Sequence, residues 1–251
     1  MWRTACKRLD HSVHPVLLRT PKTSTLPELW QTIGTAFAIN HKYNPTFITN
    51  AHVILDADGN QISDDDLAIY ALTPEGGVAG FSPMIVAKEL DIAVCEASKE
   101  AAVAVPVTFA STEPAAVGTA VASLGFPIPD APEITPKGSH LYVSERLATG
   151  FISSTSRPAK MPEWPWSDGL PHYEVNMFLY PGISGGPVFD QAGRVLGVNR
   201  GGRLHEKHVT AYGITVRNAE LLPFLDQHHV EYMSEEALPH NTIKKDPAKS
   251  T

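Results

Sequence analysis

Short apolar runs dominate the chain, and glycine, proline, asparagine or aspartate residues separate them. Long stretches with helical periodicity are scarce. The clearest runs are GTAFAI, PTFITNAHVIL, LAIYAL, PMIVA, DIAVCEA, GTAVASLGFP, YVSERLATGFI, YEVNMFLY, GPVFD, RVLGVNR and AYGITV. Many short strands with turn residues between them are typical of a β-sandwich or β-barrel, so the pattern predicts an all-β fold.

The best helical pattern comes near the end of the chain, from Asn218 to about Tyr232. Asn218 is suited to an N-cap position, and apolar residues behind it share roughly one face. These apolar residues are Leu221, Leu222, Leu225 and Val230. We expect this helix to pack on the β core.

A connector around Ser111–Val117 divides the strand-rich region near its middle, which suits two β-barrel halves. The pattern places the first half at about residues 30–112 and the second at about 117–217. Residues 1–26 carry prolines without clear periodicity and are interpreted as an N-terminal extension. Residues 233–251 are polar and are interpreted as a flexible tail.

Charge and composition exclude two classes of partner. The 251 residues are 43% hydrophobic and 19% charged, with a formal net charge of -7, which is ordinary for a folded globular protein. No basic block supplies an electrostatic footprint for nucleic acid. No segment approaches the roughly 20 apolar residues of a membrane span, and no signal peptide is evident, so a cytoplasmic location is expected.

The two cysteines, Cys6 and Cys95, lie far apart in the sequence. Cys95 lies in the apolar run DIAVCEA, where a buried free thiol is favoured over a disulfide.

Candidate chemistry is concentrated in three short motifs. Ser184 lies in GISGGP, His52 lies in TNAHV, and Asp91 opens the apolar run DIAV. GISGG also fits the nucleophile elbow of α/β-hydrolases, but an elbow is followed by a helix and by an acid and then a histidine. Here Pro187–Phe189 continues as a strand. The order His52, Asp91, Ser184 matches the chymotrypsin arrangement instead.

TNAHV, DIAV and GISGGPVFDQAGRVLGV resemble the His, Asp and Ser motifs of trypsin-like serine proteases, particularly the HtrA-like branch. The likeness covers about residues 30–226, within a protease domain expected at 27–229. It implies two packed six-stranded antiparallel β-barrels followed by a C-terminal helix, with the site between the barrels. The implied roles are Ser184 as nucleophile, His52 as general base and Asp91 as the residue that orients the imidazole. Gly182 and Ser184 would supply the backbone N–H donors of the oxyanion hole.

The chain departs from the secreted trypsins at Ile183, where they carry an aspartate that binds the N-terminus freed by zymogen cleavage. Isoleucine cannot form that ion pair, and no IVGG-like activation site precedes GTAFAI. The oxyanion loop is therefore expected to form without proteolytic activation. The segment after residue 226 is too short for the PDZ module of HtrA proteins, so regulation by a PDZ domain is not expected.

By position, Phe178 corresponds to the base of the specificity pocket and suggests small or medium aliphatic substrate side chains. The residues expected to line its wall are Asn199, Arg200, Gly201 and Gly213. Arg200 and Arg203 could instead recruit an acidic substrate side chain. Trp164 and Trp166, in the loop EWPWSDG, could form a substrate platform or close the loop on the barrel.

No metal or other cofactor is expected. The acidic segment Asp56–Asp66 begins like a calcium loop but has Gln61 where the loop needs glycine and Leu67 where it needs glutamate, so a solvated turn is favoured. The sequence therefore predicts a serine endopeptidase that acts on protein or peptide substrates. The alternative is a catalytically silent trypsin-fold protein that binds peptides or serves as a scaffold. The sequence does not specify an oligomeric state.

Overall fold

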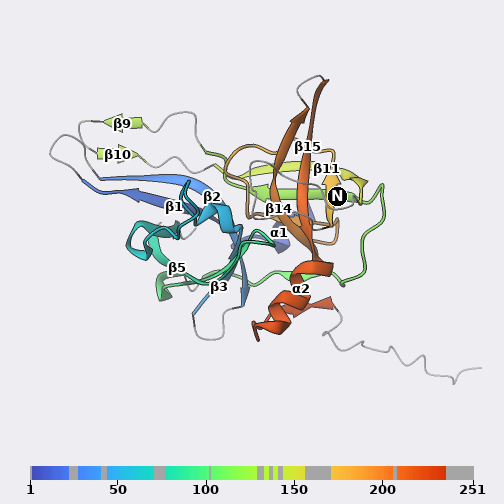
Figure 1. Ribbon diagram of the computed structural model, residues 1–251, viewed down its shortest axis with the longest axis horizontal. Coiled ribbons are helices and arrows are strands. Elements are labelled where there is room, and N and C mark those ends of the chain that lie inside the picture. Colours follow the sequence, from blue (N-terminus) through green and yellow to red (C-terminus); the bar gives the residue numbers. More distant parts are fainter. Residues whose placement is uncertain are drawn as a thin grey trace, which may run out of the picture.

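The computed structural model describes residues 2–22, 28–40, 44–70, 77–101, 103–128, 133–135, 138–140, 144–155, 171–205 and 208–235. Strands make up most of the regular structure in these residues (Figure 1). The chain begins with a short helix, α1 (Trp2–Arg8), and a second helix, α2 (Asn218–Gln227), follows the last long strand.

The first barrel is a closed sheet of six antiparallel strands in the order β1-β2-β3-β6-β5-β4. The strands are β1 (Val13–Thr20), β2 (Leu29–Asn40), β3 (Thr46–Thr49), β4 (Leu67–Tyr70), β5 (Val78–Ala87) and β6 (Ile92–Ala97). Pairing of β1 with β4 closes the sheet. Phe47 and Phe81 meet edge to face inside it, with ring centroids 6.0 Å apart.

The second barrel consists of six antiparallel strands in the order β13-β8-β11-β12-β15-β14, and pairing of β13 with β14 closes it. The strands are β8 (Ala120–Gly125), β11 (Arg146–Ser154), β12 (His172–Val175), β13 (Pro187–Phe189), β14 (Val195–His205) and β15 (His208–Arg217). Two short strands, β7 (Thr108–Phe109) and β16 (Met233–Ser234), extend the sheet beside β14. A separate two-stranded sheet is formed by β9 (Glu133–Thr135) and β10 (Gly138–His140). This architecture is the chymotrypsin-like fold that the sequence predicts.

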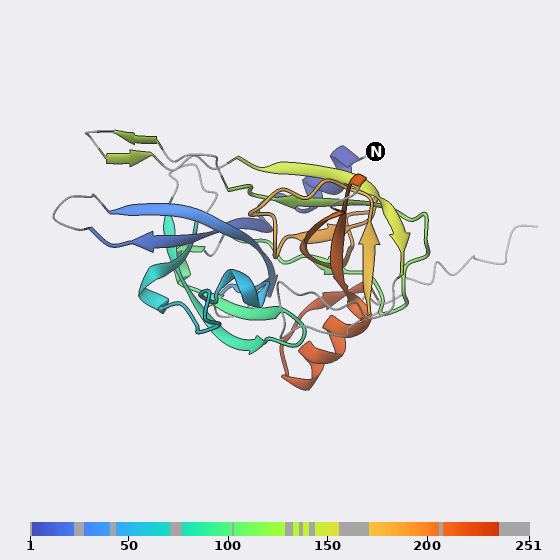
Figure 2. The same ribbon diagram turned by 45° about the horizontal axis from the view of Figure 1, so that its top comes forward.

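The two barrels lie side by side (Figure 2). One hydrophobic cluster contains residues of both barrels, and each barrel also has a cluster of its own. Phe37 and Ile48 of the first barrel lie in the same buried cluster as Phe189 and Val198 of the second and Leu222 of α2. Helix α2 therefore packs on the β core, as expected. The shared cluster fixes the position of one barrel relative to the other, which matters because the candidate site draws residues from both.

Residues 1–26 are not simply an extension, as the sequence pattern indicates, because Val13–Thr20 form a barrel strand. A β-bulge between Val16 and Leu17 puts both side chains in the interior and removes the period-two alternation that marks a strand. Pro15, which lacks an N–H donor, further obscures the pattern. The first barrel thus begins well before residue 30.

Helix α2 ends at Gln227 rather than near Tyr232, and His229 just beyond it has a positive φ of 56°. Asn218 is the first helical residue and not the N-cap, which is Arg217. The Asn218 amide instead donates to the carbonyls of Ala110 and Val195, at 3.1 and 2.8 Å. It therefore ties the helix to the sheet rather than capping it.

Both cysteines are free thiols, and Cys95 is completely buried. Burial raises the pKa of the Cys95 thiol far above its ordinary value. Among the residues that the structure describes, no helix is long and apolar enough to cross a membrane.

Candidate active site

His52 and Asp91 meet because their strands are neighbours. In the antiparallel pair β3 and β6, Thr49 lies opposite Ala93, so the residues just after β3 and just before β6 reach the same edge of the barrel. Asp91 adopts a left-handed backbone conformation with φ 55°, which aspartate tolerates better than most residues. The Asn50 side chain donates to the Asp91 carbonyl at 2.9 Å and holds this turn in place.

The Asp91 carboxylate is buried and holds His52 through both the ring and the backbone. His52 Nδ1 lies 2.9 Å from Oδ2 and 3.1 Å from Oδ1, and the His52 backbone N–H donates to Oδ1 at 3.0 Å. An ionised carboxylate only accepts hydrogen bonds, so Nδ1 carries the proton and Nε2 is the basic nitrogen. This arrangement fixes both the tautomer and the orientation of the imidazole.

Ser184 lies in the loop between β12 and β13, and Thr35 of β2 holds this loop from the first barrel. The Thr35 backbone N–H donates to the Ser184 carbonyl and its hydroxyl donates to the Gly182 carbonyl, both at 2.8 Å. Gly185 has φ 85°, and a Cβ there would lie 2.2 Å from the Thr35 carbonyl oxygen. Only glycine permits this close approach between the loop and the first barrel.

The backbone donors of this loop fall into two groups. The N–H groups of Ile183, Gly185 and Gly186 donate to the carbonyls of Tyr180, Asn199 and Ile183, respectively. For the N–H groups of Gly182 and Ser184, the structure records no acceptor in the part of the chain that it describes. Two unpaired donors that flank one residue are the arrangement that an oxyanion requires.

The orientation of the Gly182 donor follows from its neighbours. The Pro181 carbonyl accepts the Ile128 N–H at 2.9 Å. Because a trans peptide is planar, the Gly182 N–H points away from Ile128. Gly182 itself has φ 94°, and a Cβ at this position would lie 2.4 Å from the Ile128 nitrogen.

Ile183 is 2% exposed and belongs to the core of the second barrel. A Cβ on Gly125 of β8 would lie only 2.8 Å from the Ile183 Cβ, so the side chain packs directly on that strand. The Asn199 side chain donates to the Ile183 carbonyl at 3.0 Å. Apolar packing and one amide thus hold the residue before Ser184.

The sequence that carries this site matches a known protein family. The profile of the trypsin-like peptidase domain matches residues 34–198, a span that includes His52, Asp91 and Ser184. The chain belongs to the trypsin-like peptidase family.

Solved structures of other trypsin-like proteases share the fold. The active form of the Rv3671c protease from M. tuberculosis is 20% identical, with a TM-score of 0.62 over 91% of this chain and 86% of that one. The HtrA-type protease AlgWS227A with a tripeptide is 19% identical, with a TM-score of 0.61 over 92% of this chain and 64% of that one. Among curated proteins, no match is found.

Arg200 does not line the specificity pocket of this trypsin-like domain, nor does it face solvent to recruit an acidic side chain. It is 3% exposed, and its Nε donates to Asp91 Oδ2 at 3.1 Å. Its carbonyl accepts the Ser184 hydroxyl at 3.3 Å. Arg200 therefore contacts both Asp91 and Ser184, a role that the sequence did not indicate because it lies 109 positions from Asp91.

Phe178 also differs from its expected position, because it is 56% exposed and its ring lies edge to face on Tyr180. Such exposure does not fit the base of a pocket. Its neighbour Leu179 is 9% exposed, and a Cβ on Gly213 would lie 2.3 Å from its Cδ1. Leu179 is therefore the side chain that lies against the Gly213 wall.

Asn199 and Gly201 are the other two residues expected to line the wall of the specificity pocket. Asn199 is fully buried on the Ile183 carbonyl and is not available to line a pocket. Gly201 follows Arg200 on β14, opposite Ile214 of β15. Trp164 and Trp166 lie outside the described residues, as does the side chain of Arg203.

Thr35 and Asn50 are site residues that sequence reasoning missed. Each lies within a quoted run, GTAFAI or TNAHV, but neither residue type signals that it anchors a distant loop. The expected turn at Asp56, by contrast, is seen. The Asp56 carboxylate accepts the backbone N–H groups of Asp58 and Asn60, and the Asn60 bond contributes most to lowering its pKa.

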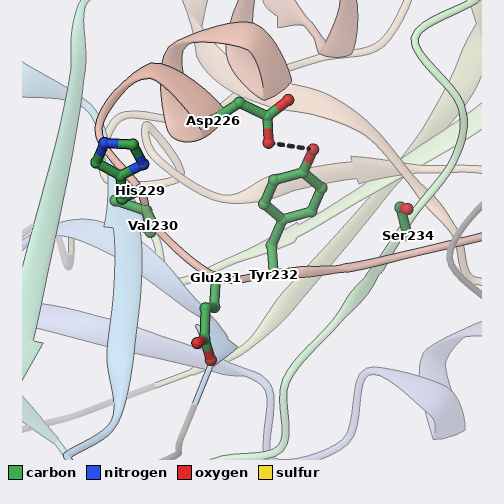
Figure 3. A pocket seen from close by; sticks show the side chains of 6 residues that line it. All are labelled: Asp226, His229, Val230, Glu231, Tyr232 and Ser234. Carbon is green, nitrogen blue, oxygen red and sulfur yellow. Dashed lines mark hydrogen bonds between the residues drawn. The ribbon is translucent and has the colours of Figure 1, made fainter.

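A separate surface groove lies at the end of α2 (Figure 3). Its lining residues are Asp226, His229, Val230, Glu231, Tyr232 and Ser234. The Tyr232 hydroxyl donates to Asp226 at 3.0 Å. The lining includes none of the residues that surround Ser184, so this groove is not part of the candidate active site.

Proposed function

We propose that this trypsin-like peptidase is a serine endopeptidase in which Ser184 is the nucleophile, His52 the general base and Asp91 the residue that orients it. The observation that carries the proposal is the hydrogen bond between His52 Nδ1 and buried Asp91, at 2.9 Å, which leaves Nε2 as the basic nitrogen. The N–H groups of Gly182 and Ser184, for which the described part of the chain holds no acceptor, support the same assignment.

In the first step Ser184 Oγ forms a bond to the peptide carbonyl carbon, and Nε2 of His52 takes the hydroxyl proton. The carbonyl electron pair moves onto oxygen, and the Gly182 and Ser184 N–H groups bind the resulting oxyanion. His52 then returns the proton to the leaving amine as the C–N bond breaks. Water repeats the sequence on the acyl-enzyme and regenerates Ser184.

The hydroxyl must first leave the Arg200 carbonyl, on which the structure records it at 3.3 Å. The mechanism requires a rotation about the Ser184 Cα–Cβ bond that redirects it to His52. The same contact is the observation that favours the second candidate function, a silent peptide-binding protein in which the hydroxyl stays on that carbonyl.

No zymogen cleavage is required in this proposal, since Ile183 holds the loop by burial rather than by an ion pair with a new N-terminus. The test is to label protein that carries an uncleavable N-terminal fusion. Equal labelling with and without the fusion supports constitutive activity. Labelling that develops only after N-terminal cleavage contradicts it.

The decisive experiment is labelling with a fluorophosphonate, which forms an Oγ–P bond to an activated serine and releases fluoride. We expect the native protein to label and the variants Ser184→Ala and His52→Ala not to label. The control variants Ser234→Ala and His229→Ala, in the groove of Figure 3, should label normally. Labelling that survives in Ser184→Ala overturns the assignment, and a native protein that never labels but still binds peptides favours the silent alternative.

A further inference from the structure

Two aromatic side chains lie exposed just before the candidate nucleophile loop. Phe178 is 56% exposed and Tyr180 is 43% exposed, and their ring centroids are 4.6 Å apart. Seven of the nine phenylalanines of this protein are buried, so the exposure of Phe178 departs from the usual pattern of the chain. Apolar side chains that cluster at a surface, unlike single ones, mark interaction sites.

The backbone before the loop explains why both rings face outward. From Val175 to Tyr180, buried and exposed residues alternate, as in a strand with one face on the core. Leu179, between the two aromatic residues, is 9% exposed and lies against Gly213. Phe178 and Tyr180 therefore occupy outward positions, where polar residues are usual. We call these two side chains the aromatic platform.

Neighbouring groups hold the Tyr180 ring in place. The guanidinium carbon of Arg146 lies 5.9 Å from the centroid of the Tyr180 ring, within the range of a cation–π contact. The Phe178 ring meets the same ring edge to face. Side chains that are already ordered lose little conformational freedom when a ligand binds, so the aromatic platform is prepared for binding.

The aromatic platform is continuous with the loop that carries Ser184. The Tyr180 carbonyl accepts the Ile183 N–H at 3.3 Å, which closes a turn around Gly182. The outer Cα atoms of such a turn lie within about 7 Å of each other, and Ser184 follows about 3.8 Å further on. An extended peptide advances by about 3.3 Å per residue, so its side chains within about four residues of the bond at Ser184 can reach the platform.

The size of the surface suits one side chain of a peptide. Ile128, which is 45% exposed and lies beside Gly182, adds one more apolar group. A stable interface between two folded proteins needs about 20 residues on each side, far more than these three. A third aromatic ring, by contrast, can pack edge to face or offset against the pair that is already present.

We propose that the aromatic platform binds an aromatic side chain of the substrate, located within about four residues of the bond that is cut. The proposal rests on the proposed function and adds a substrate class to it, namely extended peptides with a phenylalanine, tyrosine or tryptophan near the cleavage site. Selection then depends on an outer contact that Phe178 and Tyr180 make.

The test measures peptide binding in the Ser184→Ala background, where the proposed nucleophile is absent. The probes are two unlabelled peptides of about twelve residues, long enough to extend past the reach of the platform in both directions. One consists of alanine and serine with a single central phenylalanine, and the other has alanine in place of the phenylalanine. Isothermal titration calorimetry should show that the phenylalanine peptide binds about tenfold more tightly. An equal Kd for the two peptides, or no binding of either, overturns the proposal.

Variants of the platform assign the preference to these two rings. Phe178→Ala and Tyr180→Ala should each reduce the preference to about threefold, whereas Tyr180→Phe keeps the ring and should keep the preference. Met84→Ala is the matched control, because Met84 is 58% exposed on β5 of the first barrel. A preference that survives in the double variant Phe178→Ala/Tyr180→Ala, or that is lost equally in Met84→Ala, overturns the proposal.

Turnover separates a binding role from a structural one. A contact made equally in the bound substrate and in the transition state affects KM and not kcat. The double variant should therefore raise KM for the phenylalanine peptide about tenfold and change kcat by less than about twofold. A fall in kcat at an unchanged KM contradicts the binding role. If the native protein is not labelled by the fluorophosphonate, the endopeptidase proposal fails, and the calorimetry in Ser184→Ala still decides whether the platform binds aromatic side chains.

Discussion

Thr35 is the contact through which the first barrel holds the nucleophile loop, and its removal gives the sharpest test of that arrangement. The Thr35 hydroxyl donates to the Gly182 carbonyl at 2.8 Å and accepts the Phe126 N–H at 3.0 Å, both in the interior. Thr35→Val keeps the shape of the side chain and removes both hydrogen bonds.

The expected cost follows from the two backbone groups left without partners. A buried polar group that loses its partner costs about 1–3 kcal/mol, so the free energy of unfolding should fall by about 2–6 kcal/mol. In a chain of this size, a loss of ~4 kcal/mol lowers Tm by roughly 8–16 °C. The Gly182 carbonyl also loses its anchor, so the labelling rate should fall by about tenfold or more.

Thr32→Val is the matched control, since Thr32 lies on the same strand, is 1% exposed, and its hydroxyl has no hydrogen-bond partner among the residues that the structure describes. This variant should change stability by less than about 1 kcal/mol, or increase it. The assay is thermal unfolding followed by circular dichroism, with labelling measured at a temperature where every variant is folded. If Thr35→Val loses no more stability than Thr32→Val, the hydroxyl does not hold the loop as we infer.

Three further predictions concern single residues. Gly182→Ala should lower the labelling rate about a hundredfold. An alanine is strained at a φ of 94°, and its Cβ would lie 2.4 Å from the Ile128 nitrogen, so the backbone N–H that binds the oxyanion must move. A native labelling rate would show that this N–H is not used. Burial raises the pKa of both the Cys6 and the Cys95 thiol. Ellman's reagent should therefore react slowly with Cys6, at a rate that rises with pH, and with Cys95 only after the protein unfolds. Rapid reaction of Cys95 in the folded protein would contradict this prediction. Burial lowers the pKa of His14 from 6.5, so below pH 6.5 the imidazole takes up a proton more readily in the unfolded chain, and the folded protein loses stability as the pH falls. The difference between Tm at pH 5.5 and Tm at pH 7.5 should therefore be smaller in His14→Gln than in the native protein. Equal differences in the two proteins would refute the assignment.

Local patterns predicted much of the fold. AYGITV lies within strand β15 because its apolar residues fit a closed sheet. Of PTFITNAHVIL, only Thr46–Thr49 form a strand, and Ala51–Val53 form a short 3-10 helix. The pattern of apolar and polar residues did not predict strand β1 (Val13–Thr20), because a bulge shifts its register and Pro15 interrupts its row of backbone N–H donors. Bulges depend on the partner strand, so a single segment carries little trace of them.

The same distinction applies to the candidate site. Motif order pointed to His52, Asp91 and Ser184, because each lies in a short segment of recognisable composition. Position in the chain pointed to Phe178 as a pocket base, but the structure exposes that ring and buries Leu179 beside it. Which of two adjacent apolar residues turns inward depends on loop geometry, which the linear pattern does not contain.

By itself, the sequence determined the all-β class, the family and the three residues on which the proposed chemistry rests, since these follow from short-range patterns. Only the tertiary structure decided that Thr35 holds the Ser184 loop and that Arg200 is buried on Asp91. Both contacts join segments that are distant in the chain, and their partners are set by barrel packing and by a bulge in β14. Neither packing nor strand register can be read from residue types at a fixed spacing.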